Sequence, residues 1–258
     1  MARLWRQRRR DVKENLRRVL GTASERVLDE AADEAFSSYA RYWVESARLV
    51  DMNPRFLLSH TVIENYDALL AAQAAGRGAI IALPHLGSWE VGGRWLSLKG
   101  NPMTTVVEPA RPPELFEWMR RQRSAFGLEI VPLGRDALGI LTRRLRQGRV
   151  VGLVADRDIA GNGVEVDLFG EKTRLPGGPA VLALRTGAAL FPAAVYQRPW
   201  GYYRGVIRPE IEAVRAGGFR EDVVAITQRL AHEFEDLIRA APTQWHVFQP
   251  NWPTTEGA

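Results

Sequence analysis

Residues 78–90 read GAIIALPHLGSWE, and this stretch decides the fold of the chain. Residues 78–84 form a short apolar run behind a glycine, which is typical of a strand buried inside a sheet. Trp89 opens a stretch with helical spacing that continues to Leu98. A strand, a short turn and a helix in this order predict one unit of a parallel sheet, with His85 directly after the strand.

The same alternation of strand and helix continues toward the end of the chain. Further strands are predicted at residues 104–108, 129–133, 150–156, 165–169, 189–196 and 202–207. Helices are predicted between several of them, at residues 89–98, 113–126, 136–147 and 178–186, and a last amphipathic helix runs from about Phe219 to Ala240. The pattern therefore predicts an α/β fold with a largely parallel central sheet flanked by helices.

The first part of the chain has a different pattern. Apolar residues recur at helical spacing over residues 25–48 and again over residues 62–75, and Gly76 and Gly78 interrupt that spacing. We therefore expect a helical N-terminal layer over residues 1–75 and an α/β core over residues 76–258, together forming a single domain. A chain of 258 residues is long enough to bury the core that such a domain needs.

The composition of the chain excludes some kinds of site and favours some kinds of partner. The chain has no cysteine, which excludes disulfides, thiolate metal sites and a cysteine nucleophile. Its formal charge is +5, with arginine dominating, which suits phosphate-bearing partners such as anionic lipid, nucleic acid or a nucleotide-containing cofactor. Residues 1–21 predict a basic helix that is only partly amphipathic. Such a helix could touch a membrane surface or could simply be solvated.

His85 is the sharpest candidate for chemistry. It follows a buried strand, where ligands of open α/β sheets usually bind, and four residues separate it from Glu90 in the first turn of the next helix. This spacing can bring the carboxylate onto the imidazole, which would free the other ring nitrogen to take a proton from a hydroxyl. The alternative is a structural histidine at a strand end. A zinc site is not expected, because the segment holds one histidine and no other has ligand spacing with it.

The block PHLGSWE at residues 84–90 resembles the motif of histidine, four residues and an acid of the lysophospholipid acyltransferase superfamily. More narrowly, the chain resembles the late acyltransferases of lipid A biosynthesis and, within them, the phosphatidylinositol mannoside acyltransferases of bacterial envelopes. Five other segments carry the resemblance: VKENLRRVL at 12–20, SYARYWVESARL at 38–49, VADR at 154–157, GVEVDLFGEKTRLPGGP at 163–179 and RTG at 185–187. The resemblance spans nearly the whole chain and implies a glycerolipid acyltransferase-like fold.

The resemblance also implies a reaction. His85 takes a proton from a mannose hydroxyl of a lipid-linked mannoside acceptor, with Glu90 as its partner, and the oxygen attacks the thioester of acyl-CoA. Acyl-CoA is then a substrate, and no cofactor or metal is expected. The enzyme should lie peripherally on the cytoplasmic face of the plasma membrane, against an anionic membrane surface, with no nucleic acid as partner.

Five further residues are candidates for substrate binding. Glu108 ends a strand at the same edge of the sheet, and the resemblance places an acid of this kind in the active-site groove. Arg123 belongs either to a solvated helix face or to a phosphate site. Asp156 and Arg157 follow another apolar strand, and we expect Arg157 in the groove and Asp156 as a partner of a sugar or an arginine. Arg174 precedes a glycine-rich turn that could hold a phosphate or could simply connect a strand to a helix.

Two other functions stay open at this point. The acceptor could be a lipid A precursor, with acyl carrier protein as the donor. The chain could also be a non-catalytic basic protein that binds membranes or nucleic acid, which its charge of +5 would suit and which would not need His85.

Overall fold

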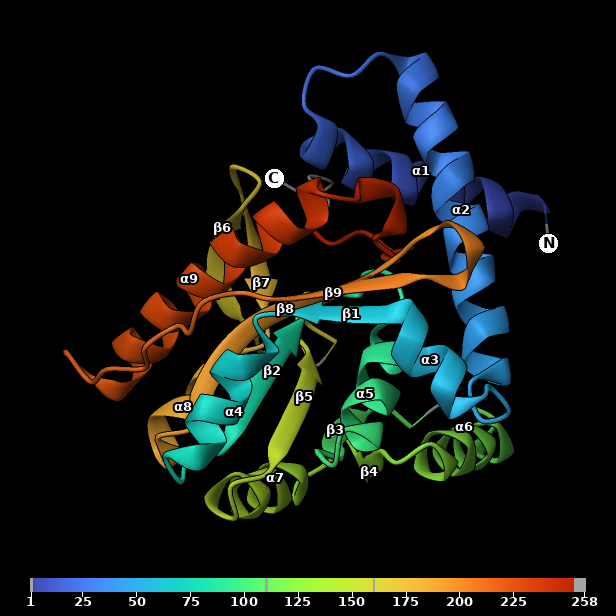
Figure 1. The fold of residues 1–258 in the computed structure, drawn as a ribbon. Helices are drawn as coiled ribbons and strands as arrows, with labels where there is room; N and C mark the ends of the chain where they lie inside the picture. Colours follow the sequence, from blue (N-terminus) through green and yellow to red (C-terminus); the bar gives the residue numbers. More distant parts are fainter. Residues whose placement is uncertain (1, 110, 160, 253–258) are drawn as a thin grey trace.

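A computed structural model describes residues 2–109, 111–159 and 161–252 of the chain. Within these ranges, seven strands form one sheet in the order β1-β9-β8-β2-β5-β3-β4, and every pairing except the antiparallel β8–β9 is parallel (Figure 1). The strands of this sheet are β1 (Thr61–Glu64), β2 (Ala79–Leu83), β3 (Met103–Val107), β4 (Glu129–Pro132), β5 (Val150–Val154), β8 (Ala189–Gln197) and β9 (Tyr203–Ile207). The predicted α/β fold with a largely parallel sheet is confirmed.

Helices pack on both faces of this sheet. They are α1 (Ala2–Leu20), α2 (Glu25–Arg48), α3 (Pro54–His60), α4 (Tyr66–Ala74), α5 (Trp89–Leu98), α6 (Pro113–Ala125), α7 (Ala137–Arg146), α8 (Gly178–Thr186) and α9 (Phe219–Arg239), with short 3-10 turns at Pro199–Gly201 and Pro242–Gln244. Side chains of β2 alternate between the two layers. Ile80 and Ala82 join the core formed with α7, α8 and α9, whereas Ile81 and Leu83 join the core formed with α3, α4 and α5.

Two segments differ from the prediction. Residues 61–64, expected to be helical, form the edge strand β1, because Thr61, Val62 and Ile63 are β-branched and pair in parallel with β9. The N-terminal layer is therefore not purely helical. Strand β6 (Val164–Leu168) stands outside the main sheet and pairs with β7 (Glu171–Leu175) as a hairpin that packs against α9.

The basic helix α1 docks on α2. Val12 and Leu16 of α1 are buried in a small core of their own with residues of α2. Three cations of α1 also form ion pairs with α2: Arg9 with Asp29 and Asp33, Lys13 with Asp29 at 2.8 Å and Glu25 at 3.0 Å, and Arg17 with Glu25 at 2.7 Å. Three of the basic side chains of α1 that could attract a membrane thus pair with carboxylates of α2. In the described part of the chain, no helix is both long enough and apolar enough to cross a bilayer.

Candidate active site

The candidate site is a cleft of about 350 Å³ at the carboxyl ends of the parallel strands. His85 follows β2 at its floor, and the walls come from α2, α6 and the segments after β3 and β5. The lining residues are Tyr39, Tyr42, Trp43, His85, Trp89, Val106, Val107, Glu108, Met119, Arg123, Val154, Arg157, Ile159 and His246. One end of the cleft is therefore charged, and much of its wall is apolar or aromatic.

Asp156 holds His85. The Nδ1 atom of His85 lies 2.5 Å from Oδ1 of Asp156, and the backbone N–H of His85 donates to Oδ2 at 2.9 Å. The parallel register of β2 and β5 explains this pairing: Leu83 is opposite Val154, and His85 and Asp156 each follow two residues later. The indole N–H of Trp245 donates to Oδ2 at 2.7 Å, which fixes the carboxylate from the other side.

The electrostatics of Asp156 favour a carboxylate. Its side chain is 1% exposed, and burial alone would raise its pKa. The positive charge that His85 can carry and the hydrogen bonds from His85 and Trp245 outweigh burial, so the pKa of Asp156 is lowered overall. A carboxylate accepting at Nδ1 of His85 leaves Nε2 as the nitrogen that can take a proton.

Glu90 does not hold the imidazole, so the prediction that it is the partner of His85 is wrong. Its buried carboxylate accepts from Nε and Nη2 of Arg123 at 2.7 and 2.6 Å, from the hydroxyl of Tyr42 at 3.2 Å, and from Ser46. From the first turn of α5, the side chain lies between α2 and α6 rather than against β5. Glu90 therefore ties three helices together behind the cleft wall.

Arg123 is neither a solvated residue nor a free phosphate ligand. Its side chain is 7% exposed and is paired with Glu90, and its guanidinium carbon lies 5.4 Å from the ring centre of Trp89. Burial would lower the pKa of Arg123, but the charge of Glu90 raises it overall, so the arginine stays charged. Burial also raises the pKa of Tyr42 well above its usual value, with Glu90 adding to the effect. Arg123 thus contributes a fixed charge to the wall of the cleft.

The remaining predicted residues lie at the charged end of the site. A second cleft of about 450 Å³ shares Glu108, Arg157 and Ile159 with the first, and Arg174 lines it. The guanidinium of Arg157 donates to Gln249 at 2.8 Å. The structure therefore gathers all the predicted residues around two adjoining clefts. His85, Glu108, Arg123, Arg157 and Arg174 line them, and Asp156 and Glu90 are buried directly behind.

Two residues of the C-terminal segment complete the site and were not predicted. Trp245 anchors Asp156, and His246 lines the cleft, with its backbone N–H donating to the carbonyl oxygen of His85 at 2.7 Å. Nε2 of His246 lies 2.9 Å from the hydroxyl of Ser38. Burial and, to a smaller extent, nearby His85 lower the pKa of His246 to about 3, so this second imidazole stays neutral. A charge on His85 thus meets no second cation from His246.

Across the residues that the structure describes, no three histidine, aspartate or glutamate side chains lie close enough to hold an ion. The arrangement provides an imidazole whose Nδ1 is held by a carboxylate. Such a group can remove a proton from a hydroxyl at Nε2 and later return it to a leaving group.

The chain is similar to several known proteins. Residues 1–254 match the model of the bacterial lipid A biosynthesis acyltransferase family. The chain is 43% identical over 248 residues to a phosphatidylinositol mannoside acyltransferase of Mycobacterium tuberculosis, covering 93% of this chain and 76% of that protein. It is 40% identical over 244 residues to the Mycolicibacterium smegmatis protein of the same name, covering 93% and 78%. A lipid A biosynthesis palmitoleoyltransferase of Escherichia coli is 28% identical over 189 residues, covering 71% and 58%.

Proposed function

Because the chain belongs to the bacterial lipid A biosynthesis acyltransferase family and is therefore an acyl-transferring enzyme, we propose that it moves a long-chain fatty acyl group from acyl-CoA to a mannose hydroxyl of a phosphatidylinositol mannoside. The observation that carries the mechanism is the contact between His85 and Asp156 at 2.5 Å, which leaves Nε2 available as a base. The acceptor follows from the names of the relatives that are 40–43% identical to this chain.

The proposed reaction needs only this histidine for proton transfer. Nε2 of His85 takes the hydroxyl proton of the acceptor while the oxygen attacks the thioester carbonyl. The tetrahedral intermediate then loses the thiolate of CoA, which takes the proton back from the imidazolium. The products are the ester and free CoA. The Asp156 carboxylate stabilises the imidazolium that exists between the two proton transfers.

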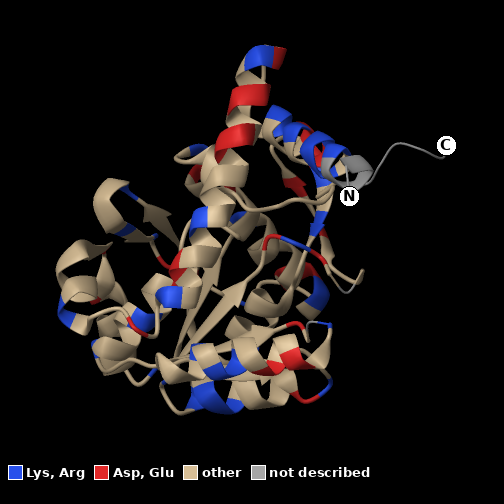
Figure 2. Cartoon of the chain, turned by 90° about the vertical axis from the view of Figure 1, so that its right-hand side faces the viewer, with Lys and Arg blue, Asp and Glu red and all other residues tan. Residues whose placement is uncertain are grey.

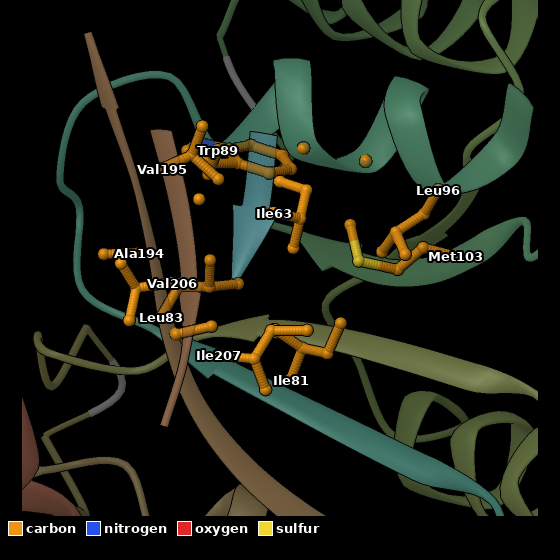
Figure 3. Close-up of a pocket in the computed structure, with 14 residues that line it drawn as sticks. Ile63, Ile81, Leu83, Trp89, Leu96, Met103, Ala194, Val195, Val206 and Ile207 are labelled. Atoms are coloured by element: carbon orange, nitrogen blue, oxygen red, sulfur yellow. The ribbon is translucent and has the colours of Figure 1, made fainter. Parts of the chain in front are cut away.

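The two clefts suit the two kinds of group on the substrates. Tyr39, Trp43, Met119 and Ile159 give the first cleft an apolar wall against which an acyl chain can lie. Trp89 also lines a small apolar cavity of about 30 Å³ between α5 and the sheet, behind the first cleft (Figure 3). At the other end, Arg157 and Arg174 can meet the phosphates of CoA or of the lipid.

The location of the enzyme follows from its substrates. A phosphatidylinositol mannoside resides in a bilayer and acyl-CoA is water-soluble, so the protein should work peripherally at the cytoplasmic face of the plasma membrane. Figure 2 shows Lys and Arg positions interspersed with Asp and Glu positions along the outer helices. The net charge of +5 favours attraction to an anionic lipid surface.

The test is to incubate the purified protein with palmitoyl-CoA and a phosphatidylinositol mannoside while following free CoA and product mass. We expect CoA release that depends on the acceptor and falls roughly 10²–10⁴-fold in His85→Ala. His232→Ala is the matched control, because His232 is an exposed histidine on α9. Full activity in His85→Ala would overturn the mechanism. Transfer only from an acyl carrier protein thioester to a lipid A precursor would instead identify the alternative substrates.

A further inference from the structure

The turn between β8 and β9 presents a large apolar side chain to solvent. Trp200 is 91% exposed, the highest value among the exposed large apolar residues of the described chain. Its φ of 63° lies in the left-handed region, which is a strained conformation for a tryptophan, and Gly201 follows with φ 72°. The backbone therefore turns the indole outward rather than onto the sheet.

Further aromatic and apolar side chains surround the base of this turn. Phe56 and His60 of α3 stack with ring centres 3.8 Å apart, and His60 lies 4.3 Å from the ring of Tyr202. Val62, on the edge strand β1, is 64% exposed. We call Phe56, Val62, Trp200 and Tyr202 the apolar tip. Exposed large apolar side chains gathered on neighbouring elements in this way mark a surface that meets another phase or another molecule.

Cations flank the apolar tip. Arg198 immediately precedes the turn, Arg55 precedes Phe56, and both are exposed. Neither forms an ion pair within the described residues, whereas Arg204 is already paired with Glu64 at 2.6 Å. Two unpaired arginines around an exposed indole match the chemistry of an anionic bilayer interface, where tryptophan rings lie at the level of the head groups and arginines meet phosphates.

The apolar tip lies next to the helix that borders the active site. Gln197, at the end of β8, donates to Glu45 of α2 at 3.2 Å, and α2 also supplies Tyr39 and Trp43 to the cleft. Figure 1 shows the β8–β9 turn beside α2 at the right-hand edge of the molecule. A bilayer contact at this turn would therefore place α2, one wall of the cleft, close to the lipid surface.

We propose that the β8–β9 turn is a membrane anchor, in which Trp200 enters the interface of an anionic phospholipid bilayer and Arg198 and Arg55 contact its phosphates. This inference rests on the proposed function, because an acceptor held in a bilayer requires the enzyme to work at a lipid surface. The occupant is a bilayer because Trp200, 91% exposed at the apex of the turn, can be surrounded by lipid. The surrounding charge complements anionic head groups.

The test is flotation of the purified protein with phosphatidylcholine vesicles, with and without phosphatidylinositol. Trp200→Asn is the informative variant, since asparagine tolerates a positive φ and the turn should persist. We expect its vesicle partition coefficient to fall roughly tenfold or more, because the variant lacks the indole that would be buried in the bilayer interface. Arg198→Gln should weaken binding only to the vesicles that contain phosphatidylinositol. Val214→Ser removes another exposed apolar side chain, from the loop before α9, and should bind as the wild type does.

Partitioning of Trp200→Asn equal to that of the wild type would overturn the proposal. So would an equal loss in Val214→Ser, or a change in the oligomeric state of Trp200→Asn without a change in vesicle binding. Acyl transfer is measured in parallel on substrates dispersed in detergent, where Trp200→Asn should keep full turnover. Absence of transfer in the wild type would count against the proposed function, and the vesicle result would still decide the anchor.

Discussion

His85 and Asp156 stand side by side because each follows its strand by two residues from the register pair Leu83–Val154, and their side chains meet at 2.5 Å. The acid that orients the histidine therefore comes from the neighbouring strand, 71 residues along the chain. Glu90, only five residues beyond His85 in sequence, is paired with Arg123 instead. The two acids therefore differ in role: Asp156 orients His85, and Glu90 holds Arg123 in the wall of the cleft.

Asp156→Asn should leave the fold intact and impair the chemistry. The amide keeps the shape of the carboxylate but cannot stabilise an imidazolium on His85, so kcat should fall roughly 10²–10⁴-fold. The KM for acyl-CoA should change little. Steady-state kinetics on the purified variant give both values. A variant with wild-type kcat would show that His85 does not depend on this carboxylate.

Glu90→Gln should reduce stability. It leaves the charge of Arg123 buried without a partner, which typically costs about 3–5 kcal/mol of the free energy of unfolding. Denaturant unfolding measures this, and the double variant Glu90→Gln with Arg123→Met should recover much of the loss. Glu64→Gln breaks the solvent-exposed pair with Arg204 and, as the control, should cost less than about 1 kcal/mol. Equal losses in the two single variants would contradict the structural role given to Glu90.

His246 should make the protein less stable as the solution becomes acidic. The pKa of His246 is about 3 in the folded chain, against an ordinary value of 6.5. Between pH 3 and pH 6.5 the unfolded chain therefore binds a proton at this histidine and the folded chain does not. The stabilisation is complete above pH 6.5 and is lost as the pH falls. In His246→Gln this titrating group is gone. The slope of the unfolding free energy against pH should therefore fall by up to about 1.4 kcal/mol per pH unit, the value for one proton. Unfolding curves between neutral and acid pH test this, and parallel slopes in the two proteins would refute it.

Arg174→Gln should weaken substrate binding and leave the chemical step unchanged. Arg174 lines the second cleft, away from the atoms that hold His85, so we expect KM for acyl-CoA to rise roughly tenfold with kcat preserved. Arg220→Gln, at an exposed arginine of α9, is the matched control. A rise in KM for the acceptor instead would assign the second cleft to the lipid head group.

Much of the fold could be predicted from residues 78–98. The apolar run, the turn and the helical spacing that follow one another there correspond to β2 and α5, and α5 spans the predicted Trp89–Leu98. The rule that ligands bind past the carboxyl ends of strands also selected Glu108, Asp156 and Arg157. Strand ends can be located from the sequence alone, without knowing which residues contact one another.

The pairings within the site could not be predicted from the same pattern. The contact of His85 with Asp156 depends on β2 lying next to β5 in register, and sequence spacing favoured the nearer acid, Glu90. Trp245 and His246 arrive from a C-terminal segment without periodicity, and their position depends on the pairing of Leu86 with Trp245. Strand β1 was missed because pairing with β9 decides the conformation of a segment whose spacing also suits a helix.

In the geometry of the site, Asp156 holds His85 at Nδ1 and leaves Nε2 free. Nitrogen NMR of the His85 imidazole near neutral pH tests it most directly, since the two ring nitrogens report which one carries the proton. We predict a protonated Nδ1 and an unprotonated Nε2 in the wild type, the same signals in Glu90→Gln wherever that variant is folded, and loss of this preference in Asp156→Asn. A wild-type proton on Nε2, or a tautomer that changes with Glu90→Gln and not with Asp156→Asn, would show that Asp156 does not orient His85.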